Sequence, residues 1–192
     1  FLASVDGNGS ISIDGSVLTV APDENYHGTI TVSVVASDGQ GSGSGSFVLT
    51  VIPVNDAPLA DASSAETNED TSVNIELSGS DVDGDDLTFS VANNPSHGTV
   101  SIVGLIATYA PESNYNGNDS FTFNVSDGEL TNGSTVTITM IPVNDAPSLD
   151  DLVDASISED NSYVLELSGT DVDGDELTFL ASVDGNGSIS ID

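Results

Sequence analysis

The sequence of 192 residues contains no lysine and no arginine, although it contains 32 aspartate and glutamate residues. No carboxylate can therefore pair with a lysine or arginine of the same chain, and the balancing positive charge must come from solution. Carboxylates at this density repel one another, so a folded chain of net charge −32 implies high salt or bound divalent cations. The same charge excludes nucleic acid and anionic membrane surfaces as direct partners.

Two further absences narrow the class of protein. Cysteine is missing, so disulfides cannot cross-link small extracellular domains, and bound metal is the remaining candidate. No apolar run approaches the roughly 20 residues of a membrane span, so we expect no direct membrane insertion. The sequence begins within a repeat pattern and without a signal peptide, from which we expect a segment of a longer protein. A hydrophobic content of 37% still predicts a folded chain.

Self-comparison reveals an internal repeat. The heptapeptide Ile-Pro-Val-Asn-Asp-Ala-Pro at residues 52–58 recurs 89 residues later, and the acidic motif Asp-Val-Asp-Gly-Asp at residues 81–85 recurs at residues 171–175. The repeat predicts three parts: residues 1–55, the C-terminal part of one module; residues 56–144, a complete module; and residues 145–192, the N-terminal part of a further module.

The two ends of the chain are related. Residues 1–14 and 179–192 share the sequence FLASVDGNGSISID, and residues 145–178 joined to residues 1–55 give one further module of 89 residues. Neither terminal half can bury both faces of a sandwich alone. We therefore expect completed halves in any ordered structure, through neighbouring copies head to tail or because the chain is one window of a continuous fibre.

The complete module shows the pattern of half-buried strands. Apolar and polar residues alternate over residues 121–125 and 136–140. Further candidate strands, bounded by Gly, Asn, Pro and Ser, are residues 73–77, 87–92, 99–103 and 106–109. About seven short antiparallel strands in one module predict an all-β fold of the β-sandwich class.

The acidic motif is a candidate cation site. Asp81, Asp83 and Asp85 lie in a glycine-containing turn between two predicted strands, where short acidic side chains at alternate positions can converge. Oxygen ligands favour Ca²⁺, whereas zinc would need His or Cys, and the chain has only His27 and His97. A solvated acidic turn is the alternative interpretation.

Other polar residues occur where modules meet or strands end. Asn55 and Asp56 lie in the short linker, which is either a cation-clamped junction or a plain Asx-Pro turn. Glu69 precedes the first strand predicted for its module, and the sequence leaves open which sandwich end it occupies. Asp38 and Asp127, each in a Ser-Asp-Gly triplet, are turn formers first and ligands second.

These motifs together resemble the bacterial cadherin-like repeats of giant secreted or cell-surface adhesins, which are related to VCBS-type arrays. The resemblance rests on Glu-Asp, Asp-x-Asp-Gly-Asp, Asn-Tyr-x-Gly, Ser-Asp-Gly and Val-Asn-Asp-Ala-Pro in this order, and it covers the whole chain. It implies tandem cadherin-like or immunoglobulin-like β-sandwich modules of about 89 residues joined by short calcium-binding linkers. The implied protein is extracellular and non-enzymatic.

The resemblance also implies that calcium ions lie between successive modules. The implied ligands are Asn55, Asp56, Asp81, Asp83 and Asp127 at the first junction, and Asn144, Asp145, Glu69, Asp171 and Asp173 at the second. The remaining candidates are Asp85 and Asp175, which replace the Asn or Gly of animal cadherins, together with Glu159 and Asp38.

The leading functional hypothesis is a calcium-rigidified spacer, or stalk, whose partners are neighbouring modules of the same array and possibly other copies head to tail. A self-assembling extracellular filament or matrix subunit is a second hypothesis that the sequence does not separate from the first. An enzyme acting on glycosides is disfavoured, because the carboxylates recur in each repeat and aromatic residues make up only 5% of the chain. A carbohydrate-binding module would need a non-repeated site. We expect no small-molecule substrate.

Overall fold

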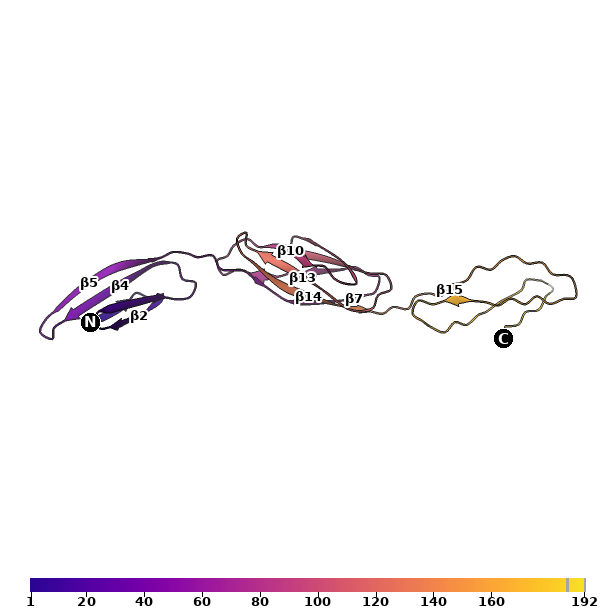
Figure 1. The fold of residues 1–192 in the computed structure, drawn as a ribbon, viewed down its shortest axis with the longest axis horizontal. Coiled ribbons are helices and arrows are strands. Elements are labelled where there is room, and N and C mark those ends of the chain that lie inside the picture. Colours follow the sequence, from indigo (N-terminus) through magenta and orange to yellow (C-terminus); the bar gives the residue numbers. More distant parts are fainter. Residues whose placement is uncertain (186, 192) are drawn as a thin grey trace.

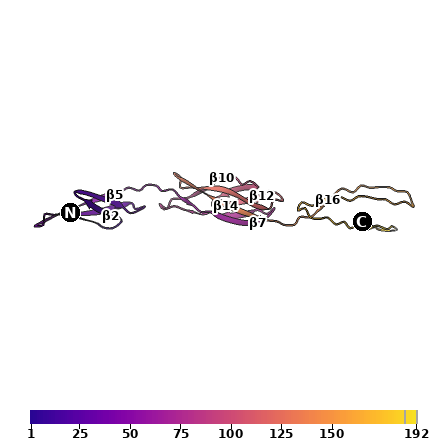
Figure 2. The same ribbon diagram turned by 60° about the horizontal axis from the view of Figure 1, so that its bottom comes forward.

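The computed structural model of the chain describes residues 1–185 and 187–191. Three bodies follow one another along a single long axis, and a second view confirms this arrangement (Figures 1 and 2). Residues 1–55, 56–144 and 145–192 are called the first, second and third modules below. The described residues form strands and turns without a helix, so none of them builds a helix that could cross a membrane.

The second module is a two-sheet sandwich. One sheet has the strand order β10-β13-β14-β7, the other has the order β11-β12-β8, and β6 pairs with β9. The strands are β6 (Leu59–Ala60), β7 (Ser63–Asn68), β8 (Val73–Glu76), β9 (Gly79–Ser80), β10 (Thr88–Asn93), β11 (Gly98–Val103), β12 (Ile106–Pro111), β13 (Gly117–Ser126) and β14 (Thr131–Ile141).

The apolar side chains of the two alternating segments form the core of this module. The apolar side chains of residues 121–125 and 136–140 point inward and are at most 2% exposed. Phe89 stacks on Phe123 with ring centroids 6.2 Å apart, and Tyr109 and Leu77 close the cluster. Each such side chain contributes about 1.5–3 kcal/mol when fully buried. The second module therefore has a core independent of its junctions.

Strand β7 corrects two sequence-based expectations. It pairs in parallel with β14, from Ser63 opposite Val136 to Asn68 opposite Ile141, so the sandwich is not wholly antiparallel. Glu69 therefore comes directly after β7, whereas the sequence predicted that it precedes the first strand of its module. The sequence Ser-Ser-Ala-Glu-Thr-Asn hid this strand, because Ala65 is its only apolar residue and a single small side chain gives no alternation signal.

The first module contains β1 (Leu2–Val5), β2 (Gly9–Asp14), β3 (Val17–Pro22), β4 (Gly28–Ser37) and β5 (Ser42–Val51). Strands β2 to β5 correspond to β11 to β14 of the second module, 89 residues earlier in the sequence. The five strands of the first module form the sheets β1-β4-β5 and β2-β3. Only Ile30 and Val32 of the described apolar residues in this module are fully buried.

The third module contains one short ladder, in which β15 (Ser148–Leu149) pairs with β16 (Gly169–Thr170). These strands correspond to β6 and β9. None of the fully buried apolar side chains of the described chain belongs to this module. The main hydrophobic core therefore lies in the second module, between the two junctions.

Candidate metal centres at the module junctions

The acidic turn of the first junction is organised by Asp81. Its Oδ1 accepts the backbone N–H groups of Asp83 at 2.8 Å, Gly84 at 3.1 Å and Asp85 at 3.4 Å. Gly84 has a φ of 82°, which glycine adopts without the steric cost of a Cβ. The turn brings carboxylate oxygens of Asp81, Asp83 and Asp85 within 4.8 Å of one another.

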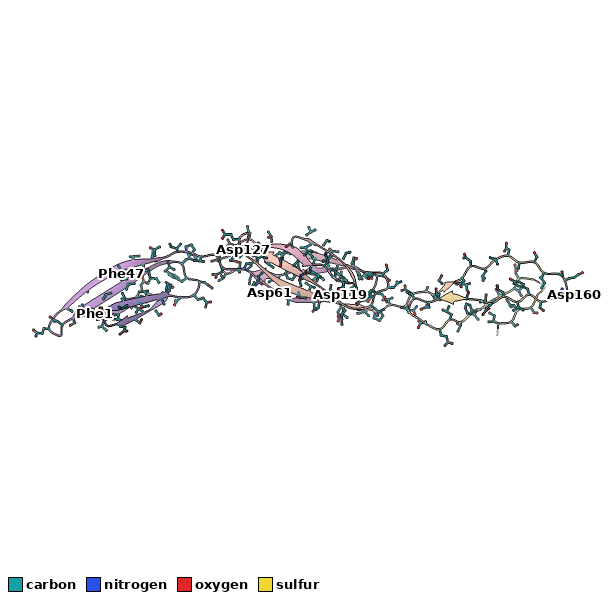
Figure 3. The ribbon with its side chains drawn as sticks, viewed as in Figure 1. Phe1, Phe47, Asp61, Asp119, Asp127 and Asp160 are labelled. Carbon is teal, nitrogen blue, oxygen red and sulfur yellow. The ribbon has the colours of Figure 1, made fainter. Side chains whose placement is uncertain are left out.

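The linker is fastened directly to these carboxylates. The backbone N–H of Asp56 donates to Oδ2 of Asp83 at 2.8 Å, and Nδ2 of Asn55 donates to Oδ2 of Asp127 at 2.8 Å. The second bond, with the backbone N–H of Leu130, holds the pKa of Asp127 below its ordinary value. The predicted ligands of this junction therefore lie together, with Asp127 at the end of the module that faces it (Figure 3).

The first junction fits a hard cation. Oδ2 of Asp81 is buried, and it has no hydrogen-bond partner among the described residues. A buried carboxylate oxygen without a partner is costly, because burial removes its hydration without replacement. The surrounding donors are carboxylate and amide oxygens, which suit Ca²⁺, and the chain has no lysine or arginine that could pair with them.

The second junction repeats this local geometry. Oδ1 of Asp171 accepts the N–H groups of Asp173 at 2.9 Å and Asp175 at 3.2 Å. The N–H of Asp145 donates to Oδ2 of Asp173 at 2.7 Å, as Asp56 does to Asp83. The side-chain amide of Asn144 donates to the carbonyl oxygen of Asp145 at 2.8 Å. The linker is therefore tied to the following module at both junctions.

Glu69 joins the preceding module to the second linker. It is only 3% exposed. Its N–H donates to the carbonyl of Ile141 at 2.9 Å, and its Oε1 accepts the N–H of Val143 at 2.5 Å. Glu69 thus extends the parallel pairing of β7 and β14 into the linker.

Negative charge accumulates at the second junction. Oδ2 of Asp145 is buried without a hydrogen-bond partner among the described residues, although the residue as a whole is partly exposed. Burial raises the pKa of Asp145, and the charges of nearby carboxylates raise it further; these belong to Asp173, Asp70, Glu69 and Asp171. Carboxylates of two modules therefore face one linker.

Asp70 is a further candidate site residue, and the sequence left its place open. It has a φ of 57°, and its Oδ1 accepts the N–H of Asn114 at 3.0 Å, which anchors it at the end of the module. The signal that could have found it is its position beside Glu69, once β7 is recognised as the strand that precedes both residues.

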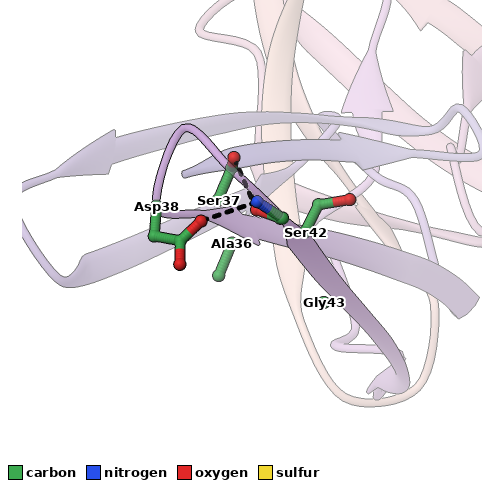
Figure 4. Close-up of a pocket in the computed structure, with 6 residues that line it drawn as sticks. Ala36, Ser37, Asp38, Ser42 and Gly43 are labelled. Carbon is green, nitrogen blue, oxygen red and sulfur yellow. Dashed lines mark hydrogen bonds between the residues drawn. The ribbon is translucent and has the colours of Figure 1, made fainter.

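Two predicted ligands lie away from both junctions. Asp38 lies at the outer end of the first module, where its Oδ1 accepts the N–H groups of Gln40 at 2.9 Å and Gly41 at 2.7 Å. It lines a shallow cavity with Ser37 and Ser42 (Figure 4). Glu159 is exposed, next to Asp160 at the outer tip of the third module (Figure 3). Neither residue reaches a described junction.

Comparison with known proteins supports an immunoglobulin-like domain in the second module. Residues 55–139 match the family model of the bacterial Ig domain. The chain is 35% identical over 146 residues to integrin beta-like protein A of Dictyostelium discoideum, which covers 65% of this chain. The chain spans only 8% of the length of that relative.

The solved structures to which the chain is similar include two cadherins. Human protocadherin-24 EC1-2 has a TM-score of 0.46 and 12% identity, with 73% of this chain and 81% of that chain covered. Drosophila N-cadherin EC1-4 has a TM-score of 0.42 and 15% identity, with 86% and 47% covered. The endo-fucoidan hydrolase MfFcnA4 of glycoside hydrolase family 107 has a TM-score of 0.35 and 21% identity, with 73% and 24% covered.

The fold prediction is confirmed: the described residues are all-β, and residues 55–139 carry an immunoglobulin-like β-sandwich. Domains of this kind are generally non-enzymatic. The relation to VCBS-type arrays and giant adhesins, the module boundaries and the individual ligands stay predictions.

Proposed function

We propose that this chain is a calcium-rigidified spacer, or stalk, segment of an extracellular repeat adhesin or fibre. One observation carries the proposal. Each junction has a buried carboxylate oxygen that lies among further carboxylates and has no hydrogen-bond partner among the described residues. This oxygen belongs to Asp81 at the first junction and to Asp145 at the second. No lysine or arginine is available to neutralise them. A divalent cation at each junction resolves both the unpaired oxygen and the repulsion.

The chain's own residues would hold the ion and fix the angle between modules. Asp81, Asp83 and Asp85 present oxygens from the following module, while Asp56 reaches them from the linker. At the second junction, Glu69 adds a carboxylate from the preceding module. When bound, Ca²⁺ supplies two positive charges and accepts six to eight oxygen ligands. Ligands from successive modules then hold the linker in one geometry.

A non-repeated polar cluster in the second module bears on the carbohydrate-binding alternative. Asp119 accepts hydrogen bonds from the backbone N–H groups of Ser96 at 3.0 Å and His97 at 2.8 Å, and from the hydroxyl of Tyr109 at 3.0 Å. The first module has Ile30 at the position of Asp119. Because both oxygens of Asp119 are already engaged within the module, the cluster acts as an internal clamp and supports neither sugar binding nor glycoside hydrolysis.

Calcium titration tests the proposal. Isothermal titration calorimetry should detect binding near the 10⁻⁴ to 10⁻³ M range typical of extracellular modules. Each site should add about 2.7 kcal/mol to the stability of the bound state at about a hundredfold excess over its dissociation constant. Magnesium at the same concentration should stabilise less, since it requires a tighter octahedral set of ligands. Absence of binding heat and of any calcium-dependent melting shift would refute the proposal.

A further inference from the structure

The hairpin of β13 and β14 contains an Asn-Gly pair whose side chain and backbone are in direct contact. The backbone N–H of Gly133 donates a hydrogen bond to Oδ1 of Asn132 at 2.8 Å. Because Oδ1 is bonded to Cγ, the side-chain carbonyl carbon of Asn132 lies beside the nitrogen of Gly133. Both residues are exposed, so water and hydroxide reach them. The contact therefore brings together the carbon and the nitrogen whose bond would close a five-membered succinimide ring.

The strand pairing leaves this N–H group available for the contact. The N–H of Asp127 donates to the carbonyl oxygen of Leu130 and closes the hairpin. Antiparallel pairs alternate from there, so Gly133 and Asn124 form a non-hydrogen-bonded pair, and the N–H of Gly133 points away from β13. On its other side, β14 pairs with β7 only from Val136 onward. Among the described residues, the adjacent side-chain amide is thus the acceptor that this N–H reaches.

Glycines that follow an aspartate donate to other acceptors instead. In the two Ser-Asp-Gly turns, the glycine N–H donates to the serine hydroxyl oxygen, at 3.2 Å in residues 37–39 and at 3.1 Å in residues 126–128. The N–H of Gly84 donates to Oδ1 of Asp81 at 3.1 Å and not to the preceding Asp83. These turns direct the glycine nitrogen away from the carboxyl group that it could otherwise attack.

Two further Asn-Gly pairs of the described chain lack the contact. In the pairs Asn8-Gly9 and Asn116-Gly117, which lie where β2 and β13 begin, no hydrogen bond within the described residues joins the glycine N–H to the asparagine side chain. Asn8 is followed by Gly and Ser, exactly as Asn132 is. The local sequence is therefore the same at these two sites, and the difference between them comes from the fold.

We propose that Asn132 is a deamidation site, which reacts ahead of the Asn-Gly pairs at residues 8–9 and 116–117. Hydroxide takes the proton of the Gly133 N–H, and the nitrogen attacks Cγ of Asn132. The new N–Cγ bond forms, the Cγ–Nδ2 bond breaks, and Nδ2 takes a proton from water and leaves as ammonia. Water then opens the succinimide at either carbonyl, which gives aspartate or isoaspartate. The net reaction consumes one water and releases one ammonia, without an oxidant or a reductant.

The product adds a negative charge to the hairpin that carries Asp127. Residue 132 lies opposite Val125, one pair away from the end of this ladder at Ser126 and Thr131. The chain has no lysine or arginine to neutralise the added charge. Isoaspartate also inserts a methylene into the backbone of β14, which disturbs the pairing beside the turn. The modification thus changes with time the hairpin that faces the first junction, and it does not rest on the proposed calcium function.

Peptide mapping of the whole chain tests the assignment. The folded chain is incubated at mildly alkaline pH in heavy-oxygen water, which labels each residue that deamidates, and is then cut by a protease specific for acidic residues, since it has no lysine or arginine. We expect Asn132 to be labelled several times faster than Asn8 or Asn116 in the folded chain, and at about the rate of Asn8 in urea. Labelling of Asn132 no faster than that of Asn8 in the folded chain, or the same excess in urea, would overturn the proposal.

The variant Asn132→Gln separates attack by the backbone from direct hydrolysis of the side-chain amide. Glutamine keeps the amide and the charge of the chain, but attack by the nitrogen of Gly133 would have to close a larger, six-membered ring, which forms far more slowly. Label at residue 132 should therefore disappear, while Asn8 keeps its rate. Label at residue 132 of this variant as fast as in the unmodified chain contradicts the inference, because it would show hydrolysis without the participation of Gly133.

Discussion

Replacing Asp83 with asparagine is expected to have opposite effects on the stability of the second module with and without calcium. Asparagine keeps an oxygen that can accept the N–H of Asp56, but it removes the negative charge. Without calcium, the change relieves repulsion from Asp81 and Asp85. With calcium, it removes a charged ligand. A purely structural role for Asp83 would give the same sign under both conditions.

The expected magnitudes follow from the geometry. The oxygens of the three carboxylates lie within 4.8 Å of one another. Two unit charges about 4 Å apart repel by about 1 kcal/mol in water, so losing two such contacts stabilises the calcium-free variant by at most about 2 kcal/mol before salt screening. With calcium, each tenfold loss of affinity costs about 1.4 kcal/mol. One kcal/mol shifts the melting temperature of a domain of this size by about 4–8 °C.

Calorimetric melting in calcium and in chelator measures this reversal. Asp86→Asn is the matched control, because it removes the same charge from an adjacent exposed residue that is not part of the three-carboxylate cluster. Asp83→Asn should melt above the wild type in chelator and below it in calcium, while Asp86→Asn should change little under either condition. A lower melting temperature of Asp83→Asn in both conditions would refute the assignment of Asp83 as a calcium ligand.

Three further outcomes are expected. Glu69→Gln should weaken calcium binding at the second junction several-fold and leave the first unchanged, whereas Glu159→Gln should affect neither; calorimetric titration of both variants checks this. The pKa of Asp145 is raised in the folded chain, so the folded junction holds a proton that the unfolded chain releases. In chelator, acidification should therefore stabilise the junction, and raising the pH through that pKa should weaken it. Melting curves recorded across this pH range measure the effect, which should be absent in the variant Asp145→Asn. Tyr109→Phe should destabilise the second module by about 1–3 kcal/mol, equally in calcium and chelator, since it removes hydrogen bonds to Asp119 and to the carbonyl oxygen of His97, neither of which is a predicted cation ligand. Urea unfolding under both conditions measures this, and a calcium-dependent difference would contradict it.

The sequence predicted the core strands because their burial leaves a period of two. Residues 121–125 and 136–140 point alternately inward, and the inward side chains are the large apolar ones. Strand β7 escaped prediction because its pairing depends on backbone hydrogen bonds to β14 rather than on apolar side chains. The position of Glu69 could not be fixed for the same reason, since it depends on the direction of that strand.

The sequence indicated which residues are candidate ligands more readily than it indicated how they are arranged at the junctions. The repeated Asp-x-Asp-Gly-Asp turn is readable because Asp81 closes it locally on the N–H groups that follow. The bond from Asn55 to Asp127 links residues 72 positions apart, which no local pattern encodes. The buried oxygen of Asp145 likewise appears only when two modules are placed together.

The distance across the first junction tests the central claim most directly. Spin labels on Ser12→Cys in β2 and Ser101→Cys in β11 occupy equivalent exposed positions of adjacent modules. Pulsed electron resonance, with the labelled chain diluted in unlabelled chain, reports the distribution of this distance within one molecule. We expect a narrow distribution in calcium and a broad one in chelator, while circular dichroism shows the sandwich still folded. The same distribution width in calcium and in chelator would contradict calcium-dependent rigidity.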